Sequence, residues 1–147
     1  GATSCSDCAA GSYDNGANVC SDCAAGQTSS AGASTCSNCP AGTYDDGSNN
    51  CADCPAGQVS SSGSSSCSNC AAGTYDDGSN SCADCAAGTI SAAGEASCSN
   101  CPAGTYDDGS NNCADCIDGH VSSAGASSCT PCASGTFDDG SNNCQSC

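Results

Sequence analysis

The spacing of the cysteines constrains this chain more than any other feature of its sequence. Cysteines recur with a period of 31 residues, as from Cys5 to Cys36, and no cysteine lies outside this grid. One repeat reads CxxC, eleven residues, CxxC and twelve residues. A fixed period of this size is typical of an array whose units contact only their neighbours. We predict such an array, with repeats at 1–35, 36–66, 67–97 and 98–128 and a partial repeat at 129–147.

The apolar composition is too poor for an ordinary hydrophobic core. Alanine contributes 24 and cysteine 20 of the hydrophobic residues, only ten larger apolar side chains remain, and leucine, methionine and tryptophan are absent. Burial of ten such side chains cannot offset the conformational entropy of ordering 147 residues. Twenty cysteines in 147 residues exceed the roughly 8–10% typical of disulfide scaffolds. The sequence predicts a small disulfide-rich repeat protein in an oxidising compartment, either extracellular or at the cell surface.

The charge of the chain limits its partners. Lysine and arginine are absent, and 15 Asp with one Glu give a net charge of −16. This charge argues against nucleic acids and anionic membranes as partners. No apolar run is long enough for a membrane span and no signal-peptide pattern is present, so we expect a mature product or an excerpt of a longer chain. The fifth repeat stops at Cys147, and we expect the array to continue.

Each repeat consists of two related halves. The first, which we call the tyrosine half, carries one aromatic ring followed by Asp, Asn and Gly residues with strong turn preference. The second, which we call the serine half, has Thr, Val or Ile in place of the ring and ends in a run of Ser, Ala and Gly. Each half is predicted to form a hairpin of about 15 residues closed by cysteine. With no helical periodicity, the expected fold is an elongated ladder of short β-hairpins and irregular loops, without helix.

The aromatic residues are the only large side chains that recur with the repeat. Aromatic rings at repeat spacing usually pack on adjacent disulfides and on the next unit. We predict that they form a small core in each repeat and the packing between repeats: Tyr13, Tyr44, Tyr75, Tyr106 and Phe137.

Metal chemistry is weakly indicated. Two CxxC pairs separated by eleven residues resemble a zinc ribbon, but every copy would need a metal and no cation is present to offset the thiolates. Redox catalysis lacks the βαβ context that CxxC oxidoreductases have. The acidic turns offer oxygen atoms for weak calcium sites, although solvated turns are the favoured explanation. The candidate ligands are Asp45, Asp46, Asn49, Asp76, Asp77, Asp107, Asp108, Asp138 and Asp139. His120 replaces Gln or Thr of other repeats, so we interpret it as a substituted surface residue, and we expect no catalytic site.

Glycosylation is the chemistry that the sequence favours, with bare flexible loops as the alternative. Serine runs at exposed tips are typical O-glycan acceptors. The candidates are Ser60, Ser61, Ser62, Ser64, Ser65, Ser122 and Ser123, with Ser66, Ser127 and Ser128 in the same runs, and Thr43, Thr74 and Thr105 beside the rings. No Asn-x-Ser/Thr sequon exists. Asn-x-Cys occurs at Asn18, Asn49, Asn80, Asn111 and Asn142, but that form is rarely used.

The motif CPAGTY, a turn and CxxC occurs at Cys39–Cys54 and Cys101–Cys116. It resembles the ephrin-receptor-like cysteine-rich repeats of extracellular proteins and one module type of tumour-necrosis-factor-receptor ectodomains. Similar arrays occur in protist surface antigens and in secreted fibrous proteins. The absence of Lys and Arg departs from what we expect of a receptor ectodomain. The motif indicates fold and compartment, but receptors, coats and filaments all use it.

The resemblance implies that the second Cys of each CxxC pairs with the first Cys of the next. The implied pairs are Cys8 with Cys20, Cys23 with Cys36, Cys39 with Cys51, Cys54 with Cys67, Cys70 with Cys82, Cys85 with Cys98, Cys101 with Cys113, Cys116 with Cys129 and Cys132 with Cys144. Cys5 and Cys147 are then left over for a longer array or for another copy. A rival scheme pairs Cys5 with Cys20 and Cys8 with Cys23, and sequence alone does not decide between them.

Taken together, these features favour an extracellular structural protein, part of a glycosylated surface coat or filament whose partner is another copy of itself or more of the same array. We expect no enzyme activity and no cofactor beyond weak calcium. A receptor or adhesion ectodomain is the alternative. One repeat with an exposed aromatic or charged patch unlike the others would favour that alternative.

Overall fold

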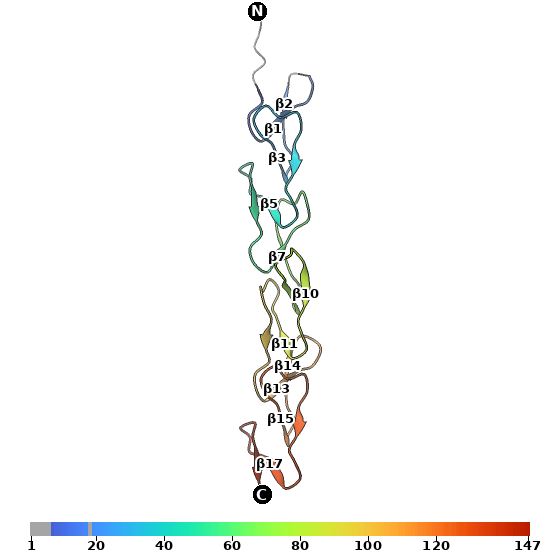
Figure 1. Ribbon diagram of the computed structural model, residues 1–147, viewed down its shortest axis with the longest axis vertical. Coiled ribbons are helices and arrows are strands. Elements are labelled where there is room, and N and C mark those ends of the chain that lie inside the picture. The colour runs from blue at the N-terminus through green and yellow to red at the C-terminus, as the bar shows by residue number, and fades with distance from the viewer. Residues whose placement is uncertain (1–6, 18) are drawn as a thin grey trace, which may run out of the picture. The chain divides into compact units, whose positions relative to one another are not determined.

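The computed structural model describes residues 7–17 and 19–147, and Cys5 lies outside them. Within this part of the chain the ordered elements are short β-strands, and no helix is present (Figure 1). Strands of the tyrosine halves have three residues each: β1 Ser12–Asp14, β2 Cys20–Asp22, β5 Thr43–Asp45, β6 Cys51–Asp53, β9 Thr74–Asp76, β10 Cys82–Asp84, β13 Thr105–Asp107, β14 Cys113–Asp115, β17 Thr136–Asp138 and β18 Cys144–Ser146. Strands of the serine halves have two: β3 Gln27–Thr28, β4 Ser37–Asn38, β7 Gln58–Val59, β8 Ser68–Asn69, β11 Thr89–Ile90, β12 Ser99–Asn100, β15 His120–Val121 and β16 Thr130–Pro131.

Strands pair with their neighbours in sequence to form antiparallel hairpins. In β5–β6, Thr43 lies opposite Asp53, Tyr44 opposite Ala52, and Asp45 opposite Cys51. The same register occurs in β1–β2, β9–β10, β13–β14 and β17–β18. The serine halves form shorter hairpins, such as β3–β4 and β11–β12. The prediction of two related hairpins in each 31-residue repeat is confirmed.

The described residues form two compact units. The first extends to Ser68 and includes Gly78–Asn80, and the second comprises Asn69–Asp77 and Ser81–Cys147. Each unit contains hairpins of both kinds. The elongated shape expected from the sequence remains a prediction.

Disulfides hold each hairpin closed. The described residues form nine, with Cα–Cα distances of 5.5–5.7 Å: Cys8–Cys20, Cys23–Cys36, Cys39–Cys51, Cys54–Cys67, Cys70–Cys82, Cys85–Cys98, Cys101–Cys113, Cys116–Cys129 and Cys132–Cys144. This is the pairing that the resemblance implies. The rival pair of Cys8 with Cys23 does not occur, because each is bonded to another cysteine. Among the described cysteines, Cys147 is free and exposed.

The buried apolar side chains are half-cystines and not the rings. Among the described residues the buried hydrophobic side chains are Cys8, Cys39, Cys70 and Cys101, and the last three are 0–1% exposed. Tyr13, Tyr44, Tyr75 and Tyr106 are partly buried, and Phe137 is 50% exposed. The rings are therefore not the buried centre of the repeats, and their packing between repeats stays a prediction.

Two glycines show how closely the serine-half hairpins of successive repeats pack. Gly26 and Gly88 have positive φ angles of 86° and 88°. A Cβ at Gly26 would overlap the carbonyl oxygen of Gly63, and one at Gly88 would overlap that of Gly125. Because a carbonyl occupies this space, any side chain there would push the hairpins apart.

Candidate functional site

A repeated asparagine contact joins three successive half-repeats. The Asn49 side chain accepts a hydrogen bond from the Ser29 amide and donates one to the Ser29 carbonyl, both at 2.9 Å. The Gly11 amide donates to the same carbonyl at 3.2 Å. We call each such Asn and Ser pair a clasp. The clasps are Asn49 with Ser29, Asn80 with Ser60, Asn111 with Ser91 and Asn142 with Ser122, with bond lengths of 2.7–3.0 Å.

The backbone prepares each asparagine for its clasp. The four Asn residues have φ angles of 57–60°, a left-handed conformation that Asn tolerates better than most residues. Their side chains lie against glycines: a Cβ at Gly42 would be 3.4 Å from Asn80, and one at Gly73 would be 3.4 Å from Asn111. The sequence pattern predicts turns at these Asn residues and does not reveal their side-chain hydrogen bonds. An Asn at a fixed place in each repeat, always two residues before Cys, was the available signal.

The clasp serines also bond through their hydroxyls. The Ser60 hydroxyl donates to the Thr43 carbonyl at 2.7 Å and the Ser122 hydroxyl to the Thr105 carbonyl at 2.7 Å. Ser60 is 9% and Ser122 is 8% exposed. Attachment of a sugar needs an accessible oxygen and removes its proton, so burial and these bonds disfavour O-glycans at Ser60 and Ser122, where glycosylation stays untested.

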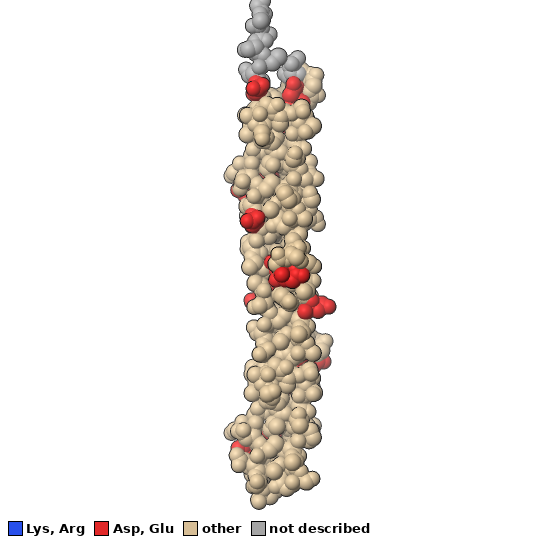
Figure 2. All heavy atoms as spheres, viewed as in Figure 1, with Lys and Arg blue, Asp and Glu red and all other residues tan. Residues whose placement is uncertain are grey.

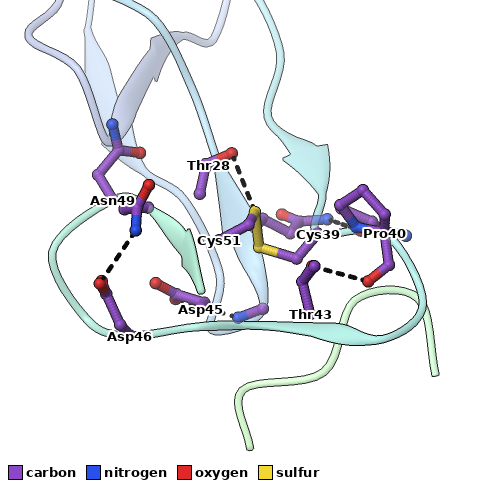
Figure 3. The surroundings of a disulfide bond; sticks show 12 residues. Thr28, Cys39, Pro40, Thr43, Asp45, Asp46, Asn49 and Cys51 are labelled. Atoms are coloured by element: carbon purple, nitrogen blue, oxygen red, sulfur yellow. Dashed lines mark hydrogen bonds between the residues drawn. A yellow bond between two sulfur atoms is a disulfide. The ribbon is translucent and has the colours of Figure 1, made fainter. Parts of the chain in front are cut away.

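The threonines beside the rings are engaged in a similar way. The hydroxyls of Thr43, Thr74 and Thr105 each donate at 2.8 Å to the carbonyl three residues earlier. Figure 3 shows the bond from Thr43 to Pro40 beside the Cys39–Cys51 disulfide. Glycosylation would remove this donor and leave the carbonyl with one partner fewer. These three threonines are therefore poor acceptors.

In the second repeat, the side-chain oxygen atoms of the candidate calcium ligands accept hydrogen bonds within the fold. Asp45 accepts from the Gly47 amide at 3.0 Å and from the Gly26 amide of the preceding half-repeat at 3.2 Å. Asp46 accepts from Ser48 and Asn50 at 2.8 and 3.2 Å (Figure 3). Asn49, the third predicted ligand, is held in its clasp.

The other acidic turns follow the same scheme. Asp107 accepts from Gly88 and Gly109, Asp108 from Ser110 and Asn112, Asp138 from Gly140, and Asp139 from Ser141 and Gln145, while Asp76 and Asp77 each have an interaction partner as well. Within the described ranges no three His, Cys, Asp or Glu side chains are grouped to hold a metal ion. Weak calcium binding stays a prediction.

Hydrogen bonding shifts the pKa of two exposed turn carboxylates. The Ser48 amide, followed by the Asn50 side chain, lowers the pKa of Asp46. The Ser110 hydroxyl, followed by the Asn112 side chain, lowers the pKa of Asp108. On the face shown in Figure 2, acidic side chains lie singly or in small groups. These carboxylates form an acidic exterior rather than one concentrated site.

One place in the fourth repeat departs from the pattern. Ile117 stands where the earlier repeats have Ala24, Pro55 and Ala86, and it is 71% exposed. Asp118 and the partly buried His120 follow it, and the His120 ring lies 3.3 Å from the Asp118 carbonyl. Both line an open hollow of about 500 Å³ with Asp115 and Asp138. Ile117 itself does not line the hollow, but its sequence neighbours Cys116 and Asp118 do.

The fold and its contacts define a class: a small disulfide-rich protein of tandem hairpin repeats. No helix in the described residues has the length and apolarity to cross a bilayer. Residues 26–62 match the sequence model of the family described as tyrosine-protein kinase ephrin type A/B receptor-like. This segment contains the whole Cys39–Cys51 disulfide and one cysteine each of Cys23–Cys36 and Cys54–Cys67. The suspected resemblance to ephrin-receptor-like repeats is thereby confirmed. Comparison with curated proteins gives no match. The disulfides and the receptor-like repeat indicate an extracellular or surface location.

Proposed function

We propose that the chain is an extracellular structural protein, a repeat array in a surface coat or filament, with an acidic and glycosylated exterior and no enzyme activity. The observation that carries this proposal is the recurrence of one clasp at four successive places with the same two hydrogen bonds. A structural role uses the same contact many times.

The chemistry of the conspicuous side chains supports the same proposal. The cysteines, asparagines and inner serines bond within the array, and the carboxylates of the turns bond backbone amides. Such groups position hairpins and leave few atoms free for a reaction or a cofactor. Net charge of −16 keeps an extended array hydrated and resists nonspecific association.

We propose that the partner of the array is more of the same array, either as further repeats or as another copy. The exposed Cys147 thiol stands outside the nine disulfides and is able to form a bond to another chain. Cys5, the other cysteine left over by the ladder pairing, lies outside the described residues.

Electron microscopy of native material tests this function, with reducing and non-reducing gels beside it. We expect filaments or a continuous coat. Small-angle scattering of the isolated chain is expected to give a radius of gyration well above the roughly 15 Å of a compact 147-residue globule. Discrete particles of compact size would contradict the proposal.

A receptor or adhesion ectodomain is the second candidate, favoured by the exposed Ile117 and its neighbours Asp118 and His120. An exposed apolar residue in one repeat is the kind of departure that binding requires. Adhesion of labelled protein to cells should fall with Ile117→Ser if this role is real. Ala86→Ser, at the equivalent place of the preceding repeat, is the matched control.

A further inference from the structure

Some hydroxyl groups of the serine half donate a hydrogen bond, and others do not. In the second repeat, Ser60 donates to the Thr43 carbonyl and Ser62 donates to the Cys39 carbonyl at 3.1 Å. Ser61, between them, is exposed, and its hydroxyl has no hydrogen bond to any described residue. Its carbonyl accepts from the Ser64 amide at 3.2 Å, which makes Ser61 the first residue of a tight turn.

The free serine lies beside a hollow that recurs in the first unit. Around Ser61 the hollow measures about 520 Å³ and includes Ala41, Val59 and Asn80. The equivalent hollow one repeat earlier measures about 400 Å³ and is lined by Ala10, Thr28, Ser30 and Asn49. Both volumes fall in the range of roughly 300–1,000 Å³ that small-molecule sites occupy. Each hollow offers small apolar side chains and hydroxyls, but no charge, which suits the mixed surface of a sugar.

We propose that Ser61 and its equivalents Ser30 and Ser123 carry O-linked sugar, and that the sugars on Ser30 and Ser61 rest in these hollows. Ser30 and Ser123 are exposed, and each is the first residue of the same turn. The third repeat has Ala92 at this place. The chain therefore contains its own unmodified control. This inference rests on the secretion that the proposed function requires.

Two other exposed serines are competing acceptors in the same hollow. Ser66 and Ser68 line it as well; Ser68 belongs to β8, and Ser66 lies in the turn region before that strand. A transferase must approach the acceptor with its backbone accessible, and loops meet that need better than strands. The segment 31 residues further on separates these acceptors, because Ala92 replaces the turn serine while Ser97 and Ser99 stay at the places of Ser66 and Ser68. Sugar on Ser97 would move the site to the place of Ser66.

The reaction is glycosyl transfer from a nucleotide-activated sugar, catalysed by a transferase of the secretory route. The Ser61 oxygen forms a bond to C1 of the sugar, while the bond between C1 and the nucleotide phosphate breaks. The serine proton passes to a base of the transferase, and the nucleoside diphosphate leaves. No oxidant or reductant is needed.

Glycopeptide mapping of the native protein tests the inference. Trypsin cannot be used because the chain has no Lys or Arg, but cleavage before aspartate after reduction and alkylation gives 53–75 from the second repeat and 84–106 from the third. We expect sugar on Ser61 in the first peptide and none in the second. Fragmentation that keeps the glycosidic bond assigns the residue.

Other patterns overturn the inference. Sugar on Ser99 moves the site to the strand, sugar on Ser91 or Thr105 contradicts the sorting by hydrogen bonds, and a bare 53–75 peptide removes the site. In cells that modify the wild-type chain, Ser61→Ala should lose the sugar of this peptide and Ser62→Ala should keep it. A bare peptide from material that still forms filaments refutes the glycan site alone, whereas absence of filaments with sugar present refutes the structural role alone.

Discussion

The clasp of Asn111 with Ser91 allows a quantitative prediction. Asn111→Gly keeps the positive φ but removes a 3.0 Å bond from the Ser91 amide and a 2.9 Å bond to the Ser91 carbonyl. The carbonyl retains the Gly73 amide at 3.1 Å, but the amide of Ser91, a residue only 6% exposed, loses its partner. Loss of two hydrogen bonds, with one buried amide left without an acceptor, should lower the local stability by about 2–3 kcal/mol. Asn111→Ala should cost about 1–2 kcal/mol more than Asn111→Gly, because alanine is strained at this positive φ.

Native-state hydrogen exchange is the appropriate assay, because unfolding of a cross-linked array is not a single two-state transition. A loss of 2–3 kcal/mol corresponds to about 30- to 150-fold faster exchange of the Ser91 amide, at tenfold for each 1.4 kcal/mol. Asn112→Ala removes only an exposed 3.1 Å bond to Asp108 and is the matched control, with an effect of at most about 0.5 kcal/mol. Equal exchange in Asn111→Gly and Asn112→Ala would refute the clasp.

Three further predictions test the packing, the turns and the metal question. Gly88→Ala should destabilise its surroundings by about 2–5 kcal/mol, because the new Cβ overlaps the Gly125 carbonyl at positive φ. Gly109→Ala, with a similar φ and open space, should cost only about 1–2 kcal/mol, and native-state hydrogen exchange measures both. An NMR titration should place the pKa of Asp108 below its usual value. The stability that this carboxylate contributes is then present above about pH 4 and is lost as pH falls through the lowered pKa. An ordinary pKa would contradict the hydrogen bond from Ser110. Removal of calcium by a chelator should leave the melting temperature unchanged, and a fall would establish a site that the turns do not suggest.

The repeat, its two halves and its disulfide scaffold were predictable because they depend on local spacing. Residues between Cys39 and Cys51 form one hairpin, and the turn chemistry of that hairpin lies in neighbouring residues. The clasps were not predictable in this way, because Ser29 and Asn49 are 20 residues apart and belong to different hairpins. Because its turn preference already explains an Asn in a turn, the sequence does not indicate a hydrogen-bond partner 20 residues away.

The candidate glycosylation sites also depend on contacts that local sequence does not reveal. Ser60 and Ser61 are adjacent and identical in sequence, yet one is buried and bonded and the other is exposed. Only the direction of each side chain in the folded hairpin separates them. The partial burial of Tyr44 similarly depends on the folded arrangement of the hairpins, which composition does not reveal.

The spacing of the clasp sets rules for how genes encoding such arrays can change length. From Gly11 to Ser29 is 18 residues, and from Ser29 to Asn49 is 20, so one set of contacts spans 38 residues and overlaps the next set by 7, since the period is 31. Loss or duplication of 31 residues restores every partner at its proper distance. Loss of a single serine half instead brings two tyrosine halves together and leaves an asparagine without its serine. Recombination between such copies is therefore expected to leave a family of length variants that differ in whole repeats.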